Sequence, residues 1–120
     1  MRTIKTVGVT TVALVLVGRG CWVGCDEKVP AGGVRVALLM KARTNPFFEQ
    51  MAAGAERAAA ELGVSLQVMA IDKETDTAGQ AAQVETAVGQ GVQVILIAPA
   101  DSKAIIAPLL EAQARGIRII

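Results

Sequence analysis

The sequence predicts an α/β protein in which a parallel sheet lies between layers of helices, as a three-layer sandwich. Three observations support this fold class. Short apolar runs alternate with amphipathic stretches of helical length, a glycine follows each helical stretch, and strands are expected to begin near residues 34, 64, 92 and 117. Such regular alternation favours a β-α-β-α-β-α-β order with right-handed crossovers.

The composition narrows the classes of function. Lys and Arg total 12 against 11 Asp and Glu, and from residue 26 onward the counts are 9 and 11, a net charge of −2 for that part. This balance provides no basic surface for nucleic acid and no polybasic patch for anionic lipid. Histidine is absent and both cysteines lie before residue 26. We therefore expect no cofactor, no metal site and no disulfide in the remainder.

The first 25 residues have the features of an export leader. Arg2 and Lys5 precede an apolar run of 11 residues, Val7–Val17, which is too short to span a membrane and suits the apolar core of a signal peptide. Two Gly-Cys pairs follow, and the region resembles a bacterial lipoprotein signal. We expect lipidation at Cys25, because a polar stretch begins directly after it, with Cys21 as the alternative. An ordinary signal peptide and a buried first strand remain open.

Residues 26–33 are expected to form a flexible tether, because their proline and glycines resist regular structure. Residues 34–120 would then form part of a single lobe. The expected strands are 34–40, 64–71, 92–98 and 117–120, and the expected helices are 46–62, 77–90 and 101 or 102 to about 115. The last strand is short and no helix follows it, so we expect the chain to be an N-terminal fragment.

The first predicted helix has clear start and stop signals. Asn45 occupies the N-cap position, Pro46 is the first helical residue, and Gly63 follows the end. The residues expected to face the core recur at spacings of three and four. They are Phe48, Met51, Ala55, Ala58 and Leu62.

The other two helices are less regular. The second is expected to turn Ala81, Val84 and Val88 inward and to stop before Gly91. The third would be capped by Asp101 or Ser102 and stopped by Gly116. Since Pro108 lacks an N–H, we expect a loose first turn before it or a kink.

Ligands of open parallel sheets bind beyond the carboxyl ends of the strands. The loop after the first strand leads to the only aromatic residues that follow the leader, Phe47 and Phe48. Successive helical residues point about 100° apart, so Phe48 is expected to continue the buried face and Phe47 to face the ligand. An aromatic ring can stack on a sugar, and the Asn45 amide suits hydroxyl groups. Ordinary helix packing is the alternative interpretation.

Two further loops lie at this edge. Lys41 and Asp101 are weaker candidates for ligand contact. The acidic residues Asp72, Glu74 and Asp76 could suggest Mg²⁺, but a solvated turn with a helix cap is the simpler interpretation. A nucleotide-binding enzyme is disfavoured, since neither G-x-G-x-x-G nor G-x-x-x-x-G-K-[ST] follows a predicted strand.

The segment Lys41–Phe48 closely resembles the first loop of periplasmic sugar-binding proteins of the ribose-binding type, which are ABC transporter substrate-binding proteins with the type I periplasmic-binding fold. The likeness extends over residues 34–120. Its further segments are Gly54–Glu56, Glu61–Val64, Gln83–Glu85, Ile97–Ser102 and Ala114–Ile117.

The resemblance implies a binding protein and not an enzyme. It implies sugar contacts from Asn45, Phe47 and Phe48, an ABC permease as partner, a monomer when complete, and export to the periplasm or to the cell envelope as a lipoprotein. The only membrane attachment would be the lipid anchor. Ala98 stands where ribose-binding relatives can carry a polar Asn, so ribose itself is in doubt. The alternatives with the same fold are an extracellular sensor domain of a signalling receptor and the effector domain of a LacI-type regulator.

Overall fold

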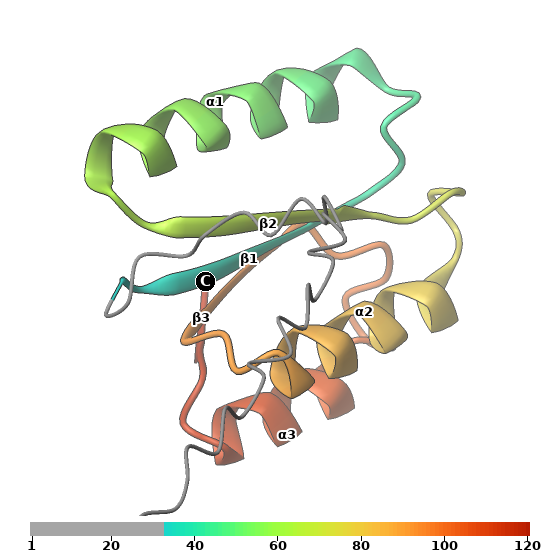
Figure 1. Cartoon of the computed structure of the whole chain (residues 1–120). Helices are drawn as coiled ribbons and strands as arrows, with labels where there is room; N and C mark the ends of the chain where they lie inside the picture. Colours follow the sequence, from blue (N-terminus) through green and yellow to red (C-terminus); the bar gives the residue numbers. More distant parts are fainter. Residues whose placement is uncertain (1–32) are drawn as a thin grey trace, which may run out of the picture.

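The computed structural model describes residues 33–120 (Figure 1). The predicted leader, the candidate lipidation sites Cys25 and Cys21, and the tether up to residue 32 lie outside the described residues. In the described part, no helix is long and apolar enough to cross a lipid bilayer.

The described residues form the expected β-α-β-α-β-α-β order. In chain order the elements are β1 (Arg35–Met40), α1 (Pro46–Leu62), β2 (Ser65–Ala70), α2 (Thr77–Gly89), β3 (Val94–Ile97), α3 (Ile106–Ala114) and β4 (Arg118–Ile119). The strands make one sheet in the order β2-β1-β3-β4, and every neighbouring pair is parallel. The predicted fold class is confirmed.

The sheet lies between two helical layers, with α1 on one face and α2 and α3 on the other (Figure 1). Successive strand residues point to opposite faces, so β1 serves both cores. Leu38 and Met40 pack toward α1 with Phe48 and Ala52. Ala37 and Leu39 pack in the second core, with buried residues of α2 and α3. This explains why β1 is apolar along almost its whole length.

Helix α1 begins and ends where the sequence predicts, but its buried face is shifted. Met51 and Ala55 are half-buried as members of the core, whereas Ala58 is exposed and Leu62 is 75% exposed, so these two expectations were wrong. Ala58 lies about 80° around the helix from Phe48, on the flank of the buried face. Leu62 lies in the last turn, and a 17-residue helix of about 26 Å overhangs six-residue strands of about 20 Å.

Helices α2 and α3 agree with the predictions in outline. Val84 is buried, and Val88 packs half-buried against the same core. Gly91 follows α2 with φ +70°, and Gly116 follows α3 with φ +84°. Asp101 caps only a turn, because its Oδ1 accepts the N–H groups of Lys103 and Ala104, at 2.7 and 2.8 Å. The α-helix itself begins at Ile106, so the expected loose turn before Pro108 is confirmed.

Candidate functional site

The candidate site lies at the carboxyl edge of the sheet, where the loops after β1, β2 and β3 all begin. The three loops leave from one edge because all strand pairs are parallel. In an open α/β sheet this edge is where ligands bind. The first loop leads into α1, the second into α2 and the third into α3 (Figure 1).

Asn45 joins the first loop to the second. Its backbone is extended, with φ −90° and ψ 119°, and its Oδ1 accepts the Phe47 N–H at 3.0 Å, as the predicted N-cap requires. Its Nδ2 donates a long hydrogen bond of 3.4 Å to Glu74 Oε1. A carboxamide has two N–H groups and two oxygen lone pairs, so one of each remains for a ligand.

Phe47 and Phe48 divide between solvent and core. Phe48, on the side of α1 that faces the sheet, is 8% exposed, whereas Phe47 is 64% exposed. The two rings form an edge-to-face pair with centroids 5.2 Å apart and planes at 83°. The expected burial of Phe48 and exposure of Phe47 is therefore confirmed. The buried ring supports the exposed one, and such pairs contribute about 0.5–1.5 kcal/mol beyond their buried area.

The third loop is held by a residue that sequence reasoning missed. Gln80, in the first turns of α2, is fully buried. Its Nε2 donates to the Ala98 carbonyl at 3.0 Å, and its Oε1 accepts the Ala100 N–H at 2.7 Å. A signal was present, because residues 80, 84 and 88 share the four-residue spacing of the buried face of α2.

The two weaker candidates lie at the same edge without joining Asn45. Lys41 is half-buried directly after β1, and Asp101 is exposed in the third loop. The N–H groups of Ala104 and Lys103 lower the pKa of Asp101 below its ordinary value of 3.8. These bonds already engage one carboxylate oxygen of Asp101, which leaves the other for a ligand.

The acidic second loop serves the fold. Asp76 caps α2 by accepting the Gly79 N–H at 2.8 Å, while Asp72 and Glu74 are exposed. Gly79 allows this cap, because a Cβ at that position would collide with the Asp76 carboxylate. Across residues 33–120, no group of three or more acidic, histidine or cysteine side chains is placed to hold a metal ion.

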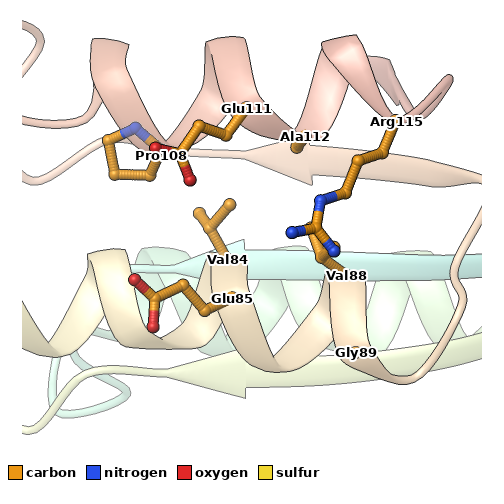
Figure 2. A pocket seen from close by; sticks show the side chains of 8 residues that line it. All are labelled: Val84, Glu85, Val88, Gly89, Pro108, Glu111, Ala112 and Arg115. Atoms are coloured by element: carbon orange, nitrogen blue, oxygen red, sulfur yellow. The ribbon is translucent and has the colours of Figure 1, made fainter.

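A groove of about 280 Å³ lies away from this edge, between α2 and α3 (Figure 2). Its apolar lining comes from Val84, Val88, Pro108 and Ala112. Arg115, directly after the end of α3, extends its side chain toward α2. Its lining contains no aromatic ring. It therefore lacks the combination of an exposed ring and a side-chain amide that the carboxyl edge presents.

Comparison with known proteins assigns the family. Residues 36–120 match the family model described as a periplasmic binding protein domain. The chain therefore belongs to this family, whose members bind ligands and are not enzymes.

The chain is similar to a D-ribose/D-allose-binding protein of Pseudomonas aeruginosa, with 38% identity over 88 residues, which are 72% of this chain and 28% of that protein. Among solved structures, it is similar to a solute-binding protein of an ABC transporter from Burkholderia multivorans, with 38% identity and a TM-score of 0.71 over 73% of this chain and 32% of that one. A periplasmic solute-binding protein from Actinobacillus succinogenes with bound D-allose gives 35% identity and a TM-score of 0.69 over 72% and 30%. The chain thus spans about a third or less of these relatives.

Proposed function

We propose that the chain contributes the first part of a sugar-binding site to the substrate-binding component of an ABC transporter. The observation that carries this proposal is the exposed ring of Phe47 beside the partly free amide of Asn45, at the carboxyl edge of a parallel sheet. The relatives support it, since one is named for D-ribose and D-allose and another holds D-allose.

The proposed contacts follow from the chemistry of a monosaccharide. A pyranose or furanose ring has an apolar face of C–H groups, which an aromatic ring can cover, and a rim of hydroxyl groups. The Phe47 ring would take the apolar face, and the remaining N–H and lone pair of Asn45 would bond a hydroxyl. Phe48 would act from below by holding the Phe47 ring in its edge-to-face position.

The side chain of Ala98 offers a sugar no polar contact. It follows β3 at the binding edge, and its side chain packs with the apolar residues under α1. A methyl group offers no hydrogen bond, so the selected sugar would not depend on a polar contact from this position. We therefore extend the proposal to monosaccharides such as D-allose without assigning one sugar.

The remaining parts of the proposal concern the complete protein. The proposal includes export to the periplasm or cell envelope, a lipid anchor at Cys25 or Cys21, delivery of sugar to an ABC permease, and a monomeric state. The description of the family as periplasmic supports the export. The leader-like sequence before residue 26 supports export.

The test is an NMR titration of the 120-residue chain with D-allose, D-ribose, D-arabinose and D-glucose. One ring and one amide support only weak binding, with a dissociation constant on the order of 1–10 mM, near −4 kcal/mol at its tighter end. We expect amide shifts confined to residues 41–48, 72–76 and 98–104 for at least one sugar.

The control is Phe47→Leu, which keeps an apolar side chain but removes the aromatic face. It should reduce the sugar-induced shifts while leaving the spectrum of the free chain outside α1 unchanged. Shifts of equal size in both proteins, or shifts centred on the α2–α3 groove, would contradict the proposed site.

A further inference from the structure

Gln80 is the only fully buried polar side chain among residues 33–120. Burial of a carboxamide is unfavourable unless both its donor and its acceptor are satisfied. Here both are, through the 3.0 Å bond to the Ala98 carbonyl and the 2.7 Å bond from the Ala100 N–H. Three residues further along α2, Gln83 has a buried Oε1 without a partner in the described part. The amide of Gln80 thus makes two buried hydrogen bonds, whereas the buried oxygen of Gln83 makes none within the described part.

The two bonds of Gln80 flank Pro99, where the sheet ladder stops. Ala98 is the last residue to donate to β1, through its N–H to the Leu39 carbonyl at 2.9 Å. Pro99 has no N–H, so the ladder cannot continue through it. The Ala98 carbonyl and the Ala100 N–H would then lack partners. The carboxamide of Gln80 supplies one donor and one acceptor, as a neighbouring strand's peptide group would.

Gln80 also lies between the second and third loops of the binding edge. The second loop ends at Asp76, which caps α2 four residues before Gln80. The third loop begins at Ala98, on the far side of the Gln80 amide. The Asn45–Glu74 bond connects the first loop to the second. The Gln80 N–H donates to the Asp76 carbonyl at 3.1 Å, and the Gln80 side chain bonds the third loop, so hydrogen bonds connect all three loops.

We propose that Gln80 is a positioning residue that fixes the backbone of residues 98–101 and thereby the shape of the ligand-binding edge. Its role in binding rests on the proposed function. Its role in ordering the third loop does not, because that role follows from the buried bonds alone.

The first test measures amide hydrogen exchange by NMR in the 120-residue chain and in its variants Gln80→Leu and Gln80→Glu. Leucine offers neither bond, so exchange at Ala100 should accelerate about 10-fold or more. Glutamate keeps an acceptor for the Ala100 N–H, so protection at Ala100 should be largely retained.

Two control variants separate loop ordering from general destabilisation. Gln83→Leu makes the same chemical change three residues away, and Val84→Ala opens a small void in the same buried face of α2. Both should leave the exchange rate at Ala100 unchanged relative to the rest of the sheet. Equal acceleration at Ala100 in Gln80→Leu and Val84→Ala would overturn the proposal.

The second test repeats the sugar titration in these variants. We expect Gln80→Leu to weaken the sugar-induced shifts about 5-fold or more relative to Val84→Ala, because a disordered loop must be ordered on binding. Undiminished shifts in Gln80→Leu would overturn the role in binding. If the unmodified chain binds no sugar, the proposed sugar contacts of Phe47 and Asn45 fail, and the exchange comparison still decides whether Gln80 orders the loop.

Discussion

Replacing each phenylalanine by alanine should produce very different losses of stability. A phenylalanine ring buries about 150–250 Å² in a core, which at about 25 cal/mol per Å² amounts to roughly 4–6 kcal/mol. Phe48 is 8% exposed and packs on Leu38, Met40 and Ala52, so its replacement should cost about 3–5 kcal/mol. Phe47 is 64% exposed, so its replacement should cost about 1 kcal/mol, mostly through the lost ring pair.

The assay is urea unfolding of the 120-residue chain monitored by circular dichroism. A loss of about 3–5 kcal/mol approaches the total stability of a small domain, so Phe48→Leu provides a milder variant of the same test. The slope of free energy against urea should stay constant across the variants if they share one folded state. Equal midpoints for the two alanine variants would refute the assignment of one ring to the core and one to the surface.

Three further predictions concern local structure and the pH response. Gly54→Ala should raise stability by about 0.5–1 kcal/mol, since Gly54 lies in a helix and a Cβ there meets nothing within 4 Å. Gly79→Ala makes the same change in α2 but displaces the Asp76 cap, so the gain should be cancelled or turned into a loss of up to about 1 kcal/mol. Thermal melts should therefore place Gly54→Ala above Gly79→Ala, and equal melting temperatures would contradict the role of the cap. The pKa of Asp101 is lowered in the folded chain, so its stabilisation of the turn is present above the ordinary value of 3.8 and is lost as the pH falls through the lower folded value. The amide shifts of residues 103 and 104 should therefore titrate below pH 3.8, and Asp101→Asn should abolish that titration. Asn45→Asp should lower the melting temperature slightly, because aspartate still caps the helix but sets a second carboxylate beside Glu74 in place of the amide donor. It should also weaken the sugar-induced shifts through loss of that donor, and unchanged shifts would exclude Asn45 from the site.

The features that were predicted correctly from the sequence arise from interactions between residues that are close together in the chain. Asn45 and Pro46 mark the start of α1 because the capping oxygen, Asn45 Oδ1, and the N–H that donates to it, that of Phe47, lie two residues apart. The choice between Phe47 and Phe48 needs only the angle between successive helical residues and the spacing of the apolar residues, which places Phe48 on the buried face. The glycine after each helix is likewise a local signal, with positive φ at Gly63, Gly91 and Gly116.

The features that the sequence did not predict involve residues that are far apart in the chain. Gln80 bonds residues 18 and 20 positions away, and a glutamine on a helix is ordinarily expected to face water. The Asn45–Glu74 bond spans 29 positions. The exposure of Leu62 depends on how far α1 extends past the sheet, which periodicity within the helix does not encode.

The proposed contact between the Phe47 ring and the C–H face of a sugar is tested most directly by intermolecular nuclear Overhauser effects. Selective labelling of phenylalanine resolves two rings, since the chain has two Phe and no Tyr. With D-allose in excess, we predict cross-peaks between sugar C–H protons and the Phe47 ring that disappear in Phe47→Leu. Cross-peaks from the sugar to residues of the α2–α3 groove, with none to Phe47, would contradict the account.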